Sequence, residues 1–310
     1  MQNKDKLIKE LTLLKKGNSS VTAIYIFFMK FFSGIRTVEA YTLFLTVVYL
    51  VLGLKAGKEW FEKGADKYLV ISKGNDKIGT DTLICDVSCA IDCHCRLCGY
   101  CDLTDKCYAL SLETFRYYKL LKNVLSALRW LKLSFEEKIA SFEHYMDYEI
   151  EFIRFNGYGD FFDLDSYIEA FKIAEYMYNK YGIISYFYTH NKDIEAYYLD
   201  NHQDIHWFVC NFSYKEAKSH KKAIAVKITD LHKYLNNDKY IVCNGDCLKC
   251  PYCKDNDLKK TVIFVMHGNG QNAEKLIVQY YGLATLRALQ RQKRRDYLLF
   301  EQKIDSYAYA

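Results

Sequence analysis

The sequence predicts an α/β fold: a parallel sheet with crossover helices, preceded by an N-terminal helical, apolar module. From Tyr68 onward, short apolar runs alternate with stretches of helical periodicity, as expected for strands joined by crossover helices. Half of the 310 residues are hydrophobic, so the chain can bury a sizeable core. There is one proline and no long low-complexity tract, which argues against a disordered linker. The alternation leaves open whether the sheet is open or forms a complete or partial (β/α) barrel.

Residues 1–60 are predicted to form the N-terminal module. Lys4 to Lys16 has leucines at helical spacing and ends at Gly17. Two apolar stretches follow, Val21 to Phe32 and Ala40 to Leu54. The second lacks a charge but is shorter than the roughly 18 to 20 residues of a membrane-spanning helix. We therefore expect it to be buried, or to contact a partner protein or a membrane surface.

Residues 61–310 are predicted to form a cysteine-rich α/β metal-binding domain with a basic C-terminal helix. Helices are expected at Leu110 to Leu133, Leu164 to Lys180 and Lys192 to Leu199. Strands are expected at Tyr68 to Ile71, Glu149 to Phe155, Ile183 to Tyr188, Ile205 to Phe212, Ala223 to Ile228, Tyr240 to Cys243 and Thr261 to Met266. Sites in such folds lie at the carboxyl ends of the strands. We expect the strands that begin at Glu149 and Thr261 to lie close in one sheet, with the cysteines at one edge.

Eleven of the twelve cysteines fall in two short clusters, and Cys210 lies alone between them. The N-terminus is charged and lacks the apolar run of a signal peptide, so a cytoplasmic location is expected, where disulfides are disfavoured. Spacings of two and three residues let one turn of backbone direct several thiolates at one metal centre. The first cluster comprises Cys85, Cys89, Cys93, Cys95, Cys98, Cys101 and Cys107, and the second Cys243, Cys247, Cys250 and Cys253.

The second cluster carries the strongest signal. Three of its thiols recur at intervals of three residues after a fourth, like the ligand run of ferredoxins that bind iron–sulfur clusters. Gly245 and Pro251 allow the backbone to wrap around a metal. Four thiolates also satisfy tetrahedral zinc, which remains the alternative.

The first cluster has more thiols than one metal centre needs. Cys95, Cys98, Cys101 and Cys107 can supply a complete four-thiolate set, and Cys89 is a further candidate ligand. The spacing leaves open which four bind.

Two loops after predicted strands carry further candidate residues. In the first, Gly157 and Gly159 permit the close approach of a cofactor, and Asp160 is a candidate catalytic acid. The alternative is an ordinary turn in which Asp163 or Asp165 caps the next helix. The second loop contains His267, a candidate ligand or acid–base group.

The basic segment Arg287 to Arg295 lies on a predicted helix. Such runs are either solvated faces or nucleic-acid contacts, and a formal net charge of +5 is too small to decide between the two.

Several of these motifs together resemble the phage gene-product-88 family. The resemblance spans roughly residues 68–270 and is carried by Ser72 to Gly79, Cys107 to Glu113, Arg154 to Phe162, Cys243 to Cys253 and Val262 to Gly268. It implies a cysteine-rich protein of phages, plasmids or other mobile elements. It supports a metal site without specifying a reaction.

A second resemblance is to radical S-adenosylmethionine enzymes, which combine a partial barrel with a three-cysteine loop. Cys98-Gly-Tyr-Cys101 and Gly157-Tyr-Gly-Asp160 are similar to features of those enzymes. Three hypotheses follow: a protein with a 4Fe-4S or zinc centre serving nucleic-acid functions of a mobile element, a radical-type enzyme binding S-adenosylmethionine at an open 4Fe-4S cluster, or a zinc-stabilised binding module.

Overall fold

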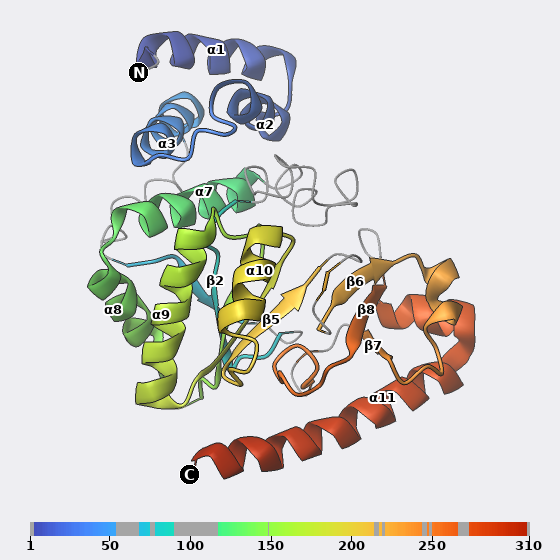
Figure 1. The fold of residues 1–310 in the computed structure, drawn as a ribbon. Helices are drawn as coiled ribbons and strands as arrows, with labels where there is room; N and C mark the ends of the chain where they lie inside the picture. The colour runs from blue at the N-terminus through green and yellow to red at the C-terminus, as the bar shows by residue number, and fades with distance from the viewer. Residues whose placement is uncertain are drawn as a thin grey trace. The chain divides into compact units, whose positions relative to one another are not determined.

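The computed structural model describes residues 3–53, 68–74, 78–89, 117–147, 149–213, 217–218, 221–243, 247, 250–265 and 273–308 (Figure 1). These ranges form a mixed α/β protein rich in parallel strands, which confirms the expected fold class. The described strands form two separate sheets, and no barrel is found among them. By clustering of contacts the chain divides into two compact units. The first contains Met1–Ile71, Cys85–Met146 and Asn156–Glu169, and the second contains Ser72–Ile84, Asp147–Phe155 and Ala170–Ala310.

The larger sheet has five strands in sequential order. Its strands are β1 (Ile71–Lys73), β2 (Thr82–Cys85), β3 (Phe152–Phe155), β4 (Ile184–Thr189) and β5 (Phe208–Phe212). The pairs β3–β4 and β4–β5 are parallel. All five residues of β5 are buried, as in a parallel strand with both faces covered.

The smaller sheet has the order β6-β8-β7, with both pairs parallel. Its strands are β6 (Ala223–Val226), β7 (Tyr240–Cys243) and β8 (Thr261–Val265). The expectation that β3 and β8 lie close in one sheet is wrong, because the chain after β5 starts a second sheet in which β6 pairs with β8. Only an isolated parallel bridge from Phe212 to Lys222 continues the pairing of β5.

Three helices form the N-terminal part of the first unit: α1 (Lys4–Gly17), α2 (Ser20–Phe31) and α3 (Val38–Leu52). Asn3, Ser19 and Thr37 cap their N-termini with side-chain oxygens. The rings of Phe28 and Phe44 lie edge to face, with their centres 4.9 Å apart, and both residues are fully buried in an apolar core.

Helix α3 coincides with the apolar stretch that begins at Ala40, and it contacts α7 (Tyr117–Lys132). Tyr41, Phe44 and Val48 are buried, so much of this stretch is used inside the unit. Among the described helices, none is long and apolar enough to cross a membrane. Contact of this stretch with a partner or a membrane surface stays a prediction, as does a domain boundary at residue 60.

The other described helices are α8 (Phe135–Tyr145), α9 (Leu164–Tyr181), α10 (Lys192–Asn201), the 3-10 helix η3 (Ile228–Lys233) and α11 (Ala273–Ala308). The α8 helix begins with a capping box, in which Ser134 accepts from the backbone N–H of Glu137 and the Glu137 carboxylate accepts from that of Ser134. Helix α11 is interrupted at Gly282, whose φ of 82° and ψ of 162° are not helical.

Candidate metal centre

The second cysteine cluster begins where β7 ends. Strand β7 buries Ile241 and Val242, and Cys243 is its last residue. Cys243 and Cys250 pack in one buried group with Ile241 and Tyr252. After Pro251 the chain makes a helical turn, in which the Pro251 carbonyl accepts from the N–H of Lys254 at 2.8 Å and of Asp255 at 2.9 Å. The described residues 250–255, which we call the cysteine loop, thus pack against the smaller sheet through Cys250 and Tyr252.

The four thiols of this cluster influence one another. The Cys243 and Cys247 thiols share a hydrogen bond that, with burial and the neighbouring thiols, raises the pKa of Cys243 well above its ordinary value. Burial raises the pKa of Cys250 to about 12. Burial also raises the pKa of Cys253, against a hydrogen bond from Tyr188 that lowers it. The metal-free thiols of Cys243, Cys250 and Cys253 are therefore protonated at neutral pH, and a metal has to displace their protons.

The described side chains do not converge on one metal position. Among the described ranges, no group of three or more His, Cys, Asp or Glu side chains has the arrangement of a metal-ligand set. Residues 244–246 and 248–249, which connect the thiols, lie outside the described ranges. The donor chemistry nevertheless fits a thiolate-ligated metal: four soft sulfur donors, three of them at the spacing of a ligand run.

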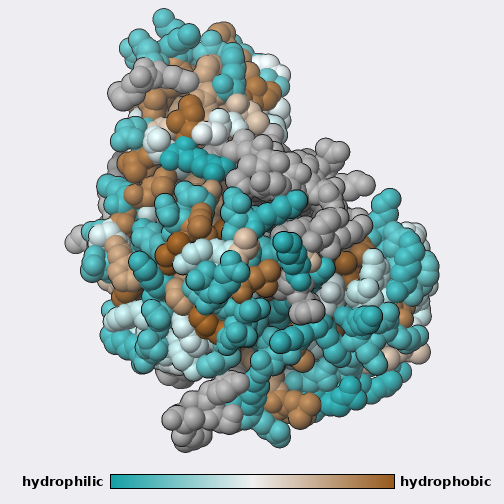
Figure 2. Space-filling view, in the orientation of Figure 1, coloured by the Kyte–Doolittle hydropathy of each residue, from teal (hydrophilic) through white to brown (hydrophobic). Residues whose placement is uncertain are grey.

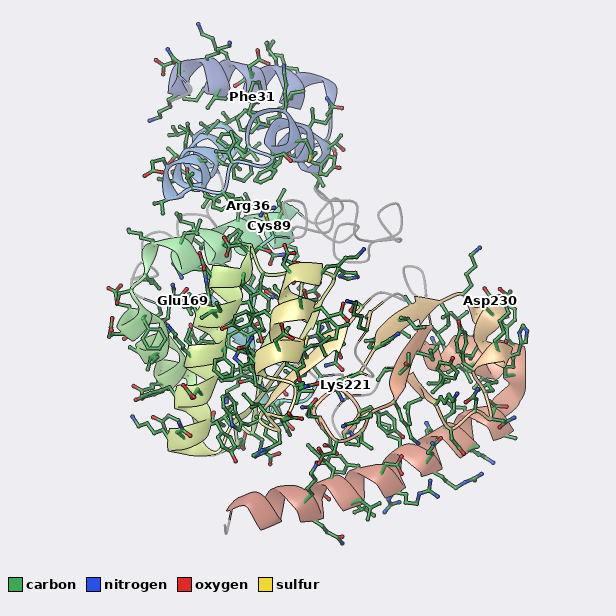
Figure 3. The ribbon with its side chains drawn as sticks, in the orientation of Figure 1. Phe31, Arg36, Cys89, Glu169, Lys221 and Asp230 are labelled. Atoms are coloured by element: carbon green, nitrogen blue, oxygen red, sulfur yellow. The ribbon has the colours of Figure 1, made fainter. Side chains whose placement is uncertain are left out.

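Lys221 is the first of several cations whose charges interact with these thiols, among which Lys293 also acts on Cys250. Its side chain (labelled in Figure 3) is 4% exposed, and its Nζ donates to the carbonyl oxygens of Tyr252 at 2.8 Å and Asp255 at 2.5 Å. Burial lowers the pKa of Lys221 to about 8, while the electrostatic influence of Cys253 and other nearby groups acts to raise it. Lys221 therefore stabilises the cysteine loop through two hydrogen bonds and also places a buried charge beside it.

Lys254 is the second cation, and it follows Cys253 directly in the sequence. It is 2% exposed, and its Nζ lies 3.6 Å from the centre of the Phe152 ring and 3.8 Å from the Asp81 carboxylate. Within the described part of the chain, this Nζ has no hydrogen-bond partner. Burial lowers the pKa of Lys254, and Asp81, Cys247 and Cys250 oppose that effect.

Arg154 of β3 is the third cation. Its guanidinium lies 5.1 Å from the centre of the Tyr188 ring, and the residue pairs in register with Tyr186 of β4. Burial alone would lower the pKa of Arg154, but Tyr186, Tyr188 and two thiols, Cys247 and Cys253, raise it. No carboxylate of the described ranges forms an ion pair with Arg154.

Carboxylates lie close to some of these cations. Asp81 is the carboxylate beside Lys254, and the Asp255 carboxylate is paired with Lys303 of α11 at 2.7 Å. Four thiolates around a divalent metal, or around a doubly positive iron–sulfur core, carry two net negative charges and would interact favourably with the cations.

Most candidate ligands of the first cluster, together with His267, lie outside the described residues: Cys95, Cys98, Cys101, Cys107 and His267. Cys89 is described and buried (Figure 3). It lies in the loop after β2, and we call the contact of this loop with the glycine loop after β3 the clasp.

The clasp joins residues 85–89 to residues 156–160. The N–H of Asn156 donates to the Cys85 carbonyl at 2.9 Å, and the Asn156 side chain accepts from the N–H of Val87 at 3.1 Å. The N–H of Tyr158 donates to the Asp86 carboxylate at 2.9 Å. Side-chain and backbone hydrogen bonds thus hold the two loops together.

Gly159 is required at the closest point of the clasp. Its φ is +74°, and a Cβ there would lie 2.9 Å from the Ser88 carbonyl oxygen and 3.3 Å from the Cys89 carbonyl carbon. A backbone-to-backbone approach of this kind admits only glycine without a shift of the chain. Gly157 lies in the same turn. Their role in binding a cofactor stays a prediction.

Asp160 is used within the clasp. It is buried, its N–H donates to Ser88 Oγ at 3.3 Å, and its Oδ1 accepts from the N–H of Phe161 at 2.8 Å. Asp163 caps α9 by accepting from the N–H of Ser166 at 2.9 Å, as the turn interpretation expected. A catalytic role for Asp160 stays a prediction.

Comparisons of the chain with protein-family models, curated proteins and solved structures give no match. The resemblances noted from the motifs therefore stay predictions. The three cations Arg154, Lys221 and Lys254 are the site residues that sequence reasoning missed, since a lysine or arginine in an α/β sequence is most often exposed.

Proposed function

We propose that Cys243, Cys247, Cys250 and Cys253 bind a closed four-thiolate metal centre, and that this centre is an iron–sulfur cluster. The observation that carries the proposal is a set of cations whose charges interact with the thiols. Cysteine thiols act to raise the pKa of Arg154, Lys221 and Lys254, so each cation interacts more favourably with metal-bound thiolates than with protonated thiols.

Iron–sulfur is preferred to zinc because the ligand run, with a proline directly after Cys250, is like that of ferredoxins. A centre held by four thiolates has no open coordination position, so it suits electron transfer or the stabilisation of the fold. Positive charge around the cluster favours its reduced form and is expected to raise its reduction potential. We accordingly propose an iron–sulfur protein rather than an enzyme that acts at this centre.

The test is anaerobic purification of the full chain, followed by iron, acid-labile sulfide and zinc assays and an absorption spectrum. Because the first cluster can hold metal of its own, the quantity to measure is the difference between the wild type and Cys250→Ala. Cys210→Ala is the matched control, since Cys210 is a buried cysteine outside both clusters.

We expect Cys250→Ala to lose both iron and sulfide, and Cys210→Ala to retain them. Loss of zinc alone would establish the zinc alternative. Equal metal content in the wild type and both variants would overturn the proposal.

A further inference from the structure

The second part of α11, after Gly282, has one face turned to the cysteine loop. Tyr252 Oη donates to the Asp296 carboxylate at 3.2 Å, and Lys303 Nζ donates to the Asp255 carboxylate at 2.7 Å. Phe300 is buried in an apolar group against which Cys253 also packs. Positions 296, 300 and 303 recur at spacings of four and three, so they share one face of the helix. Residues 252–255, which carry a metal-ligand candidate, thus hold α11 in place.

The opposite face of α11 carries a row of arginines, which we call the arginine stripe: Arg287, Arg291 and Arg294. The spacings of four and three place them on one exposed line, with rises of about 6 and 4.5 Å along the axis. No acidic residue occurs from 287 to 295. Among the described residues, none of the three forms an ion pair. Figure 2 shows a mostly hydrophilic surface along α11, in agreement with this exposure.

We propose that the arginine stripe binds the phosphate backbone of a nucleic acid, and that the metal centre governs this binding by holding the cysteine loop against α11. The second half of the proposal rests on the proposed function. Arginine forms bidentate hydrogen bonds with phosphate, and a line of three such side chains along one face can follow consecutive phosphates of a strand. The binding is electrostatic and independent of base sequence.

The distribution of apolar residues favours a nucleic acid over a lipid surface. A helix that lies in a membrane interface inserts a continuous apolar face between flanking cations. On α11 the exposed Leu283 and Leu298 stand at the two ends of the stripe, and its centre is charged. Such a surface presents charge where an interfacial helix needs apolar contact.

The coupling follows from the contacts of the cysteine loop. The loop's backbone is fixed by the turn at Pro251 and by Lys221, and the metal would fix its thiols. Loss of the metal frees the thiols of Cys250 and Cys253 and relaxes the loop that carries Tyr252 and Asp255. The segment of α11 that bears the stripe then loses two of its anchors, and the arginines are no longer held in one line.

The test is fluorescence anisotropy with labelled single-stranded and duplex oligonucleotides of mixed sequence, at several salt concentrations, on the metal-loaded full chain. The triple variant Arg287→Ala/Arg291→Ala/Arg294→Ala should bind at least about tenfold more weakly. Its salt slope on single strands should fall by roughly 2, at about 0.7 per lost phosphate contact. The matched control is Lys9→Ala/Lys15→Ala/Lys16→Ala, which removes the same charge from exposed positions of α1 and should bind as the wild type does.

Coupling is tested with the metal retained. Tyr252→Phe/Lys303→Met removes the two polar contacts of α11 with residues 252–255 without touching a thiol, and it should weaken oligonucleotide binding at unchanged metal content. Chelation of the wild type should weaken binding to a similar degree. Unchanged binding in both cases would overturn the coupling.

The outcomes separate the parts of the proposal. Equal losses in the arginine and lysine triple variants would overturn the stripe, as would wild-type binding to phosphatidylserine vesicles but not to oligonucleotides. If the wild type holds no metal and still binds oligonucleotides through the stripe, the proposed function and the coupling fail while the nucleic-acid surface stands.

Discussion

The clasp gives the sharpest quantitative prediction, the cost of Gly159→Ala. An alanine at a φ of +74° costs roughly 1 to 2 kcal/mol of conformational energy. Its Cβ would also lie 2.9 Å from a backbone oxygen, so the loop after β2 has to move. That movement disturbs the two hydrogen bonds between Ser88 and Asp160, each worth about 1 kcal/mol. We expect a total destabilisation of about 3 to 4 kcal/mol.

The matched control is Gly182→Ala. Gly182 has a similar φ of +70°, but a Cβ there meets nothing within 4 Å. It should therefore cost only the conformational part, about 1 to 2 kcal/mol. The difference of about 2 kcal/mol between the two variants isolates the contact between the two loops.

The assay is urea unfolding followed by circular dichroism, together with hydrogen exchange of peptides that cover residues 85–89 and 156–161. Gly159→Ala should lower both the free energy of unfolding and the protection of these peptides, whereas Gly182→Ala should leave their protection unchanged. Equal destabilisation by the two variants, within about 0.5 kcal/mol, would refute the close approach on which the clasp depends.

Three further predictions concern the cations, a histidine and the N-terminal core. Lys254→Met should weaken metal retention by the loaded chain, because it removes a buried cation that interacts favourably with Cys247 and Cys250; metal content equal to that of the wild type after dialysis against a chelator would contradict the charge argument. Burial lowers the pKa of His202 to about 4, so the unfolded chain binds an extra proton between pH 4 and 6.5. Stability should fall by up to about 3 kcal/mol as the pH drops through this window, and His202→Phe should flatten that fall in urea titrations. Phe44→Ala should destabilise the first unit by about 3 to 5 kcal/mol in thermal unfolding, whereas truncation of the exposed Leu13 should have little effect.

Local sequence patterns predicted those elements whose stability is itself local. Strand β7 has the expected bounds, and α9 and α10 begin where they were expected and extend one or two residues further. Their apolar spacing and flanking polar residues carry the signal. Helix α8 was missed although Ser134 and Glu137 form a recognisable capping box, so the signal was present in the sequence.

Strand β2 was missed for a different reason. Cys85 was counted in the first cysteine cluster, with a second ion or no role as the alternatives, whereas it is the buried last residue of β2. A cysteine in an apolar segment serves equally well as a small core residue. Cysteine spacing alone cannot distinguish the two uses, and it is the pairing with β3 that decides.

The extent of the sheet could not be predicted either. Alternating strands and helices are compatible with a barrel and with open sheets, because both satisfy the same local pattern. The choice depends on whether β6 adds to β5 or pairs with β8, which is a contact between segments distant in sequence. The structure has the second arrangement.

The cations near the second cysteine cluster show most clearly that the candidate metal centre depends on residues outside its cysteine motif. Arg154, Lys221 and Lys254 come from three separate segments, and the burial of the two lysines follows from tertiary packing that no local pattern encodes. In the proposed metal-bound state each of them interacts favourably with the same group of thiolates. Part of the metal's binding energy then stabilises contacts between β3, the segment before β6 and the cysteine loop, and not the loop alone. Removal of the metal should therefore lower the protection of β3 against hydrogen exchange as well as that of residues 250–257. A loss confined to the loop would mean that the cations are balanced in some other way.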